Sequence, residues 1–126
     1  MKEIMAIIRM NMINQTKRAL TEAGFSSITA RDALGRGKGL VDIKLLEGAE
    51  QGYEEAISQL GQSQRLIPKR VLFIVVKDKY VEKTVKTIMR INKTGKSGDG
   101  KIFVMPAFDS VSVRTGESGD TTLDDL

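Results

Sequence analysis

Residues 94–104 combine a glycine-dense turn with an apolar run that follows it directly. Between Gly95 and Lys101 the chain has three glycines, two lysines and one aspartate, and residues 102–105 are apolar. Glycine lets a ligand approach the backbone closely, because no Cβ is in the way. Several N–H groups of such a turn can point inward and bind an anion. The segment therefore has the composition of a phosphate-binding turn at the start of a strand.

The spacing of this turn is close to that of a P-loop. Gly95, Gly100 and Lys101 fit G-x-x-x-x-G-K, but Ile102 stands where Ser or Thr would bind magnesium. A P-loop also leads from a strand into a helix, whereas here a helical pattern leads in and a strand pattern leads out. We therefore exclude a Walker-type NTPase and retain anion binding. An ordinary glycine-rich turn with solvated lysines explains the same residues.

Composition excludes several other classes of site. The chain has 126 residues, which is the size of one domain, and it contains no cysteine and no histidine. This rules out a disulfide framework, zinc sites of the usual kind and histidine-based acid–base catalysis. We find no signal peptide and no apolar run near the roughly 20 residues that span a bilayer, so we expect a cytoplasmic protein without a membrane partner.

Charge favours an anionic ligand. The formal net charge is +4, although residues 117–126 hold four carboxylates and no base. The body of the chain is therefore more basic than the total indicates, which suits nucleotides, acidic metabolites or nucleic acid. The acidic tail is expected to be flexible. A second glycine-rich cationic turn, residues 35–39, is a further candidate for anion binding.

Hydrophobic periodicity predicts the order β-α-β, a long insert, and β-α-β. Strand patterns cover residues 3–9, 26–34, 70–76 and 101–105, with a short edge strand at 111–116. Helical spacing predicts one helix that ends near Gly24, capped by Asn11 or Asn14, and a second capped by Asp78. This order is the α+β ferredoxin-like βαββαβ sandwich. Its helices would cover one face of the sheet, and the apolar second face would need an oligomer partner.

The sequence resembles the PII signal-transduction family. Residues 94–104, TGKSGDGKIFV, are similar to its C-terminal signature nearly letter for letter, and residues 114–117, RTGE, resemble its short C-loop. Further segments align with the family pattern at the expected positions: residues 6–8, 19–25, Thr29 and 35–36. The lead 65–70 and the long insert before it are similar to the second of the paired PII-like proteins encoded with nitrogenase.

The resemblance implies a non-enzymatic sensor of nitrogen status. Residues 1–116 would form a PII-like domain that assembles as a trimer, with residues 38–66 as the regulatory T-loop between the second and third strands. ATP or ADP and 2-oxoglutarate would bind between neighbouring subunits, with Mg²⁺ held through the ATP phosphates. The implied target is dinitrogenase, contacted directly or with a PII-like sister protein in a homo- or hetero-oligomer. An ammonium channel or a nitrogen-assimilation enzyme is the alternative target.

The same resemblance implies the binding residues, and it assigns no catalytic residue and no metal ligand. Phosphates would lie on the 98–101 turn, and the adenine would meet Thr29 and Val75. The nucleotide-binding positions are Ile7, Thr29, Gly35, Gly37, Lys38, Val75, Gly98, Asp99, Gly100, Lys101 and Arg114. The 2-oxoglutarate positions are Gly37, Lys38, Gly39, Lys69 and Gly98.

Three positions depart from the family pattern. Ser112 replaces the first of two C-loop arginines, which should weaken phosphate binding. Gly37 stands where the family has a glutamine that helps to hold magnesium and 2-oxoglutarate, and Gln51, Gln59, Gln62 and Gln64 are candidates to replace it. Tyr53 lacks the surroundings of the tyrosine that is uridylylated in enteric relatives, so no uridylylation is expected.

Two functions from other classes were weighed against a sensor. A basic domain that binds RNA or DNA is disfavoured because aromatic residues make up only 5% of the chain, which leaves few rings on which bases could stack. In a phosphotransfer enzyme or hydrolase, Asp99 and Lys101 could hold magnesium and phosphate. Asp99 is better explained as a turn carboxylate that accepts hydrogen bonds from local N–H groups, and no general base is evident.

Overall fold

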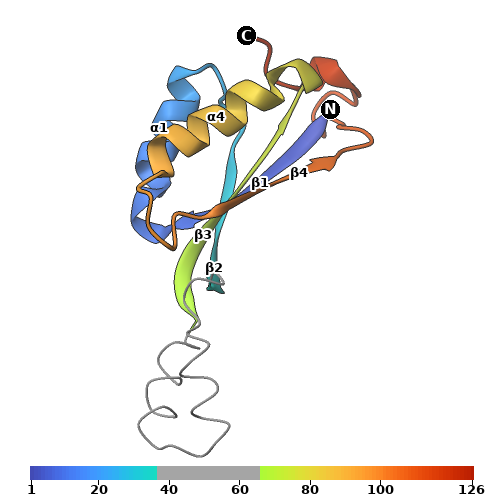
Figure 1. Cartoon of the computed structure of the whole chain (residues 1–126). Coiled ribbons are helices and arrows are strands. Elements are labelled where there is room, and N and C mark those ends of the chain that lie inside the picture. The colour runs from blue at the N-terminus through green and yellow to red at the C-terminus, as the bar shows by residue number, and fades with distance from the viewer. Residues whose placement is uncertain (37–65) are drawn as a thin grey trace, which may run out of the picture.

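In the part of the chain that the structure describes, four antiparallel strands form one sheet, and two helices lie on one of its faces (Figure 1). The computed structural model describes residues 1–36 and 66–126, so most of the predicted insert lies outside the described residues. The strands are β1 (Lys2–Arg9), β2 (Thr29–Gly35), β3 (Ile67–Val76) and β4 (Lys101–Pro106), and the helices are α1 (Ile13–Glu22) and α4 (Val81–Asn92). The described residues also form three 3₁₀ turns: η1 (Met10–Met12), η3 (Asp78–Tyr80) and η4 (Asp120–Thr122).

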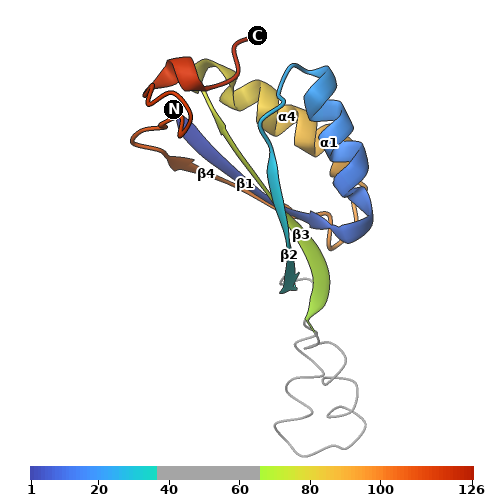
Figure 2. The same cartoon turned by 180° about the vertical axis from the view of Figure 1, so that it is seen from behind.

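The sheet order β2-β3-β1-β4 confirms the predicted ferredoxin-like βαββαβ fold. The two central strands, β1 and β3, are paired along their length, from Lys2 opposite Val76 to Arg9 opposite Lys69. Seen from behind, both helices run across the same side of this sheet, and both chain ends lie at one end of the molecule (Figure 2). None of the described helices is long and apolar enough to cross a membrane.

The core forms because alternate residues of the central strands point toward the helices. Ile4, Ala6 and Ile8 of β1 are almost fully buried. On β3 the same holds for Leu72, Ile74 and Val76. Successive strand residues point to opposite faces, so an apolar residue at every second position places all six on the helix side. Leu20 from α1 and Ile88 from α4 close the core from above.

A polar contact joins the two helices inside this apolar layer. Asn92 is buried, and its Nδ2 donates to Thr16 Oγ1 at 3.0 Å and to the Ile88 carbonyl at 2.9 Å. Thr16 in turn donates to the Met12 carbonyl at 2.7 Å. Because these groups lie out of water, their mutual hydrogen bonds fix how α1 and α4 face one another.

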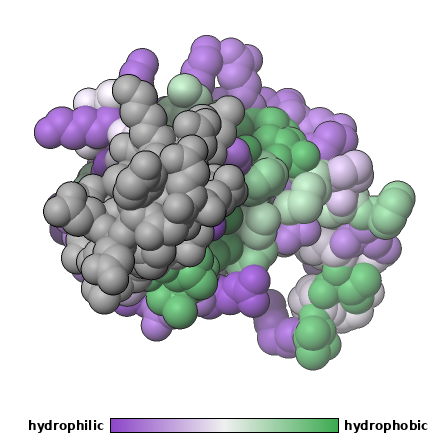
Figure 3. Space-filling view, turned by 60° about the horizontal axis from the view of Figure 1, so that its bottom comes forward, coloured by the Kyte–Doolittle hydropathy of each residue, from purple (hydrophilic) through white to green (hydrophobic). Residues whose placement is uncertain are grey.

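The opposite face of the sheet is also largely apolar, and no described element covers it. Pairing places Met5 opposite both Phe73 and Phe103, so these three side chains share this face. The Arg31 guanidinium lies 5.3 Å from the centre of the Phe73 ring on the same face. A view of the molecule from the end that carries the β2–β3 hairpin shows hydrophobic surface bordered by hydrophilic side chains (Figure 3). The apolar members are Met5, Ile7, Val71, Phe73, Val75, Phe103 and Met105.

The predicted helix starts are wrong, whereas the predicted end of the first helix is correct. Neither helix has a side-chain cap, because a 3₁₀ turn precedes each and places Met12 and Tyr80, instead of Asn11, Asn14 or Asp78, at the capping position. Gly24 ends α1 with φ of +104°, a conformation that glycine adopts readily.

The end of the chain also differs from the sequence prediction. The predicted edge strand at 111–116 is wrong, because this part of the chain forms only a single bridge between Val111 and Ser118. The acidic tail, predicted to be flexible, lies against the body of the domain, where Asp124 accepts a hydrogen bond from the Ser26 N–H and Asp125 accepts one from the Tyr80 hydroxyl.

Truncation of the central core should be costly. We expect Leu72→Ala, at a fully buried position, to lower the free energy of unfolding by about 2–5 kcal/mol, because it removes buried methyl groups and leaves a cavity. The matched control is Leu34→Ala on β2, where the side chain is 66% exposed and the loss should stay below about 0.5 kcal/mol. Urea denaturation of both variants measures the difference, and equal losses would contradict this description of the core.

Candidate anion-binding cleft

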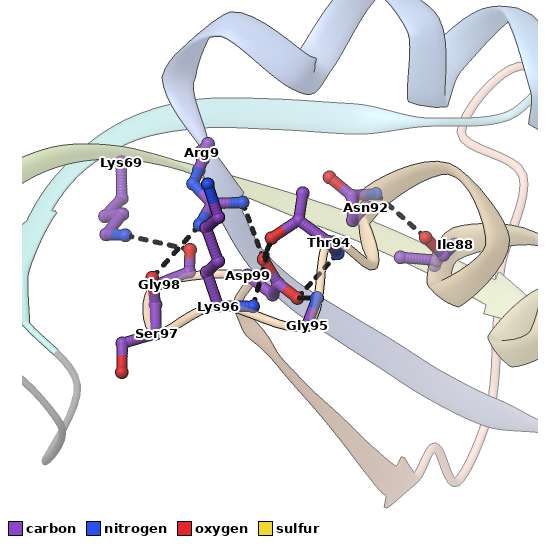
Figure 4. Close-up of polar contacts among 10 residues, drawn as sticks. All are labelled: Arg9, Lys69, Ile88, Asn92, Thr94, Gly95, Lys96, Ser97, Gly98 and Asp99. Atoms are coloured by element: carbon purple, nitrogen blue, oxygen red, sulfur yellow. Dashed lines mark hydrogen bonds and ion pairs between the residues drawn. The ribbon is translucent and has the colours of Figure 1, made fainter.

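The loop between α4 and β4 is built around one carboxylate, that of Asp99. Asp99 Oδ2 accepts hydrogen bonds from the N–H groups of Thr94 at 2.7 Å and Gly95 at 2.9 Å, and Oδ1 accepts one from the Thr94 hydroxyl. Arg9, at the end of β1, donates from Nη1 to Oδ1 at 2.7 Å. Figure 4 shows the carboxylate at the centre of these contacts. This confirms that Asp99 is a turn carboxylate that closes the loop on itself.

Asp99 has a lowered pKa and is ionised at neutral pH. Hydrogen bonds from the Thr94 hydroxyl and N–H, followed by those from Arg9 and the Gly95 N–H, hold the pKa of this carboxyl well below its ordinary value of 3.8. These donors stabilise the charged form, so their effect on the pKa exceeds that of partial burial. The carboxylate is therefore a fixed structural anion, and its bonds orient the glycines on either side of it.

Two cations from the sheet hold the carbonyl side of the same loop. Arg9 lies opposite Lys69 in the β1–β3 pairing, so both side chains reach the loop from one end of the sheet. Arg9 Nη2 donates to the Ser97 carbonyl at 3.0 Å, and Lys69 Nζ donates to the Gly98 carbonyl at 3.4 Å. In a trans peptide the N–H points away from the carbonyl that precedes it. The N–H groups of Gly98 and Asp99 therefore face away from these two cations, and neither donates a hydrogen bond within the described residues.

Glycine is required at position 100 by a close approach to β1. Gly100 has φ of +122°, and a Cβ at this position would lie 2.2 Å from the Ile7 carbonyl oxygen. Gly98 and Gly95 also have positive φ, of +93° and +83°. The backbone of the turn can thus lie directly on β1, just before Lys101 pairs with Ile7.

A cleft of about 480 Å³ opens where this loop meets the root of the β2–β3 hairpin. Four cations line it, together with Asp99, whose charge is already balanced by Arg9. Ile7 and Phe103 provide apolar wall on the open side of the sheet. The cleft therefore combines net positive charge with a glycine-rich backbone and a short apolar wall, which suits an anion that carries an apolar part. The lining cations are Arg36, Lys69, Lys96 and Lys101.

A second cleft, of about 440 Å³, lies on the helix side of the same loop. Its walls are mainly aliphatic side chains of β1, α4 and β4, among them Ile8, Val85 and Ile102. Cations line it only at Lys93 and Lys101, so the sheet-side cleft has the better chemistry for a polyanion.

The structure brings together seven of the thirteen predicted positions. Gly37, Lys38 and Gly39 lie outside the described residues. Neither Arg9 nor Thr94 was among the predicted positions. Asp99 is 90 residues from Arg9, so no local pattern links that pair, whereas Thr94 lies five residues from Asp99 in the same turn. The seven positions in the sheet-side cleft are Ile7, Gly35, Lys69, Gly98, Asp99, Gly100 and Lys101.

Thr29, Val75 and Arg114 do not line this cleft. Val75 lies opposite Glu3, four residues along β1 from Ile7, which corresponds to about 13 Å of strand. Thr29 is opposite Phe73, near the same end of the sheet as Val75. Arg114 is exposed on the segment that follows β4. None of these three positions is therefore part of the cleft wall of its own chain.

Comparison with known proteins decides the family. A family model described as "Nitrogen regulatory protein P-II" matches residues 1–117. The chain belongs to this family. The family and the fold inferred from the sequence are thus confirmed, and its members regulate nitrogen metabolism.

Individual relatives agree over almost the full chain. The chain is 46% identical to "Nitrogen fixation nifHD region GlnB-like protein 2" of Methanobacterium ivanovii, over 98% of this chain and 99% of the relative. The protein of the same description from Methanococcus maripaludis is 44% identical over 98% of this chain and 100% of its own. The chain is 36% identical to "Nitrogen regulatory protein P-II" of Azospirillum brasilense, over 94% of this chain and 96% of the relative.

A solved structure supports the same fold. The crystal structure of Arabidopsis thaliana PII bound to citrate matches with a TM-score of 0.71 and 30% identity, over 99% of this chain and 90% of that chain. The nif-region relatives show that this P-II protein is similar to the nitrogen-fixation branch, as the segment 65–70 before and at the start of β3 predicted.

Substitution of Gly100 tests the contact between the turn and β1. We expect Gly100→Ala to destabilise the protein by more than the roughly 1–3 kcal/mol that a left-handed backbone costs another residue, because its Cβ would also clash with the Ile7 carbonyl. Gly95→Ala is the matched control, since it has φ of +83° but nothing within 4 Å of the added Cβ. Thermal unfolding of both variants measures the difference, and a smaller loss for Gly100→Ala would exclude the close approach.

Acid titration tests the role of Asp99. Its folded-state pKa is depressed, so the stability it contributes is fully present above the unfolded value of 3.8 and is lost as the pH falls through the lower folded-state pKa. We expect Asp99→Asn to lower the free energy of unfolding by an amount that is constant between about pH 5 and pH 7, because the wild-type carboxyl is ionised in both the folded and the unfolded protein there. The difference from wild type should shrink only below pH 3.8. A difference that already shrinks at neutral pH would contradict this assignment, and Glu22→Gln on the exposed side of α1 is the control.

Proposed function

We propose that this P-II protein is a non-enzymatic sensor that binds ATP or ADP together with 2-oxoglutarate and regulates dinitrogenase by direct contact. The observation that carries the proposal is the glycine-rich turn, whose residues 96–101 line a cleft together with four cations. The chain has no histidine and no cysteine, and among the described residues that line the cleft the one carboxylate, Asp99, is bonded within the loop. Binding without chemistry on the ligand is what these groups support.

The cleft offers a place for each part of the ligands. Phosphates would lie on the N–H groups of Gly98 and Asp99 and near Lys101, where charge-assisted hydrogen bonds are strong. The base would pack near Ile7. Lys69, which in this structure donates to the Gly98 carbonyl, would turn to a carboxylate of 2-oxoglutarate. Mg²⁺ would neutralise phosphate charge and be held through the nucleotide.

A trimer would complete the site. Thr29, Val75 and Arg114 lie away from the cleft of their own chain, so a neighbouring subunit would have to supply them. The apolar open face of the sheet provides the surface for such an assembly, because exposed hydrophobic area of this extent favours association. Phe103 is 40% exposed on this face. Homo- and hetero-oligomers with a sister protein both fit this surface.

The cleft also touches both ends of the insert. Gly35 and Arg36 line it where β2 ends, and Lys69 lines it near the start of β3. A ligand in the cleft therefore contacts both places where residues 37–65 join the fold. It would shift the insert toward whichever state it binds more tightly, which is how a small molecule could control contact with a protein target.

The target is inferred from the relatives. Those that are 44% and 46% identical are described as proteins of a nitrogen fixation nifHD region, which supports a role beside nitrogenase. We propose that the protein inhibits dinitrogenase until 2-oxoglutarate signals nitrogen shortage. An ammonium channel or a nitrogen-assimilation enzyme is the alternative target.

Calorimetry tests the ligands. Titration with ATP and Mg²⁺ should give saturable heat, and 2-oxoglutarate should bind more tightly in their presence. Lys101→Gln should weaken ATP binding by roughly ten-fold or more, because a hydrogen bond to a charged group is lost. Lys17→Gln removes the same charge at an exposed position of α1 and should leave the ATP affinity unchanged. The absence of heat with every ligand, alone and with the sister protein, would refute the sensor.

A capture experiment tests the target. Dinitrogenase should be retained by immobilised protein with its sister, and addition of ATP with 2-oxoglutarate should release it. If ligand binding is observed but dinitrogenase is never captured, the sensor stands and its target is one of the alternatives.

A further inference from the structure

The last described residues are bound at the end of the sheet opposite to the cleft. Asp124 accepts hydrogen bonds from the Ser26 N–H at 3.1 Å, the Ser26 hydroxyl at 2.9 Å and the Ser27 N–H at 3.2 Å. These donors belong to the turn that joins α1 to β2. One carboxylate of the tail thus satisfies three donors of a segment that is 97–98 residues away in the chain.

The next residue binds a different turn, the one that joins β3 to α4. Asp125 Oδ1 lies 2.9 Å from the Tyr80 hydroxyl and 3.3 Å from Lys77 Nζ, with Lys79 Nζ at 3.8 Å. The Tyr80 hydroxyl, followed by Lys77, lowers the pKa of Asp125 below its usual range, so the carboxylate stays charged at neutral pH. Tyr80 also accepts a hydrogen bond from the Leu126 N–H at 3.1 Å.

Apolar contacts connect this polar clamp to the core. The Leu126 side chain lies on the Gly24 backbone so closely that a Cβ at Gly24 would be 2.2 Å from its Cδ2. Tyr80 packs edge-on against Phe25, with ring centres 6.1 Å apart, and Phe25 is fully buried. In Figure 2 the C-terminal end of the chain lies at the same end of the molecule as the end of α1 and the start of α4. Residues 124–126 therefore tie two turns to each other and to the core, and we call them the clasp.

The two turns that the clasp holds flank the predicted adenine contacts. Ser26 and Ser27 come directly before Thr29, the first residue of β2. Lys77 comes directly after Val76, the last residue of β3. Thr29 and Val75 both point to the open face of the sheet, because Thr29 pairs with Phe73 and Val75 is two residues further along the same strand. β2 is an edge strand, so its first residue has a ladder partner on one side only and depends on the preceding turn for its position.

We propose that residues 124–126 position Thr29 and Val75 for the adenine of a nucleotide that is bound by the neighbouring subunit. The inference rests on the proposed function, because it assigns a role to the tail in the same site. Asp124 and Asp125 are positioning residues that act through the two turns and do not touch the ligand. Their contacts are exposed to solvent, so the clasp is weakened by salt and can be opened without unfolding the core.

The test is a charge-neutralised clasp in the full chain. We compare Asp124→Asn/Asp125→Asn with the control Glu117→Gln/Asp120→Asn, which removes two charges from the same tail at exposed positions. Amide hydrogen exchange should speed up at residues 26–30 and 76–80 in the clasp variant alone, and stay unchanged at residues 94–100. This measurement needs no nucleotide.

The second readout is the ratio of the affinities for ATP and GTP. A misplaced adenine contact should reduce the preference for ATP by about five-fold, at the low end of coupling between sites. Lys101→Gln should instead weaken both nucleotides equally, because it acts on the phosphates. A tail that only stabilises the fold would not change the ratio.

The possible results separate the two proposals. Unchanged hydrogen exchange at both turns in the clasp variant overturns the clasp. Faster exchange with an unchanged ATP-to-GTP ratio overturns the positioning role. If the wild-type protein binds neither nucleotide, the proposed function fails and the positioning role with it, while the exchange data still decide whether the clasp exists.

Discussion

The antiparallel pairing of β1 with β3 determines most of what this fold can do. Its register sends Ile4, Ala6 and Ile8 toward the helices and leaves Ile7 and Arg9 on the other face. A slip of one residue would reverse both sets, exposing the core residues and burying a guanidinium, so the register is strongly fixed. The same register sets Arg9 opposite Lys69 at the end of the sheet. The cations that hold the anion-binding turn are therefore placed by the packing of the core.

The turn itself shows how one fixed charge can prepare a site for charges of the same sign. Asp99 is an anion inside a cleft that suits anions, yet its charge is matched by Arg9 and its oxygen atoms are used by Thr94 and Gly95. It does not repel a ligand, because its field is neutralised locally. What it contributes is the shape of the backbone, so that N–H groups are held in place before a ligand arrives. Preorganised donors lose little entropy on binding.

The two ends of the sheet would have different tasks in the assembly that we propose. One end holds phosphates through glycine N–H groups and lysines, and the other presents Thr29 and Val75 to a neighbour. Within one chain Val75 lies about 13 Å of strand from the level of Ile7, and we propose that a nucleotide meets both kinds of residue across a subunit boundary. This arrangement would make ligand binding sensitive to how subunits pack. The tail clasp lies at the second end and would tune it independently of the first.

The sequence determined the elements and the chemistry of the cleft, because both depend on short patterns. Alternation predicted β1 and β3, and the glycines and lysines of residues 94–101 predicted the turn and the family. Only the tertiary structure decided the contacts that hold the turn and the tail. Arg9 meets Asp99 across 90 positions and Asp124 meets Ser26 across 98, so no local pattern signals either pair. The helix starts were mispredicted because a 3₁₀ turn precedes each helix, and residues 111–116 form only the Val111–Ser118 bridge in place of a strand.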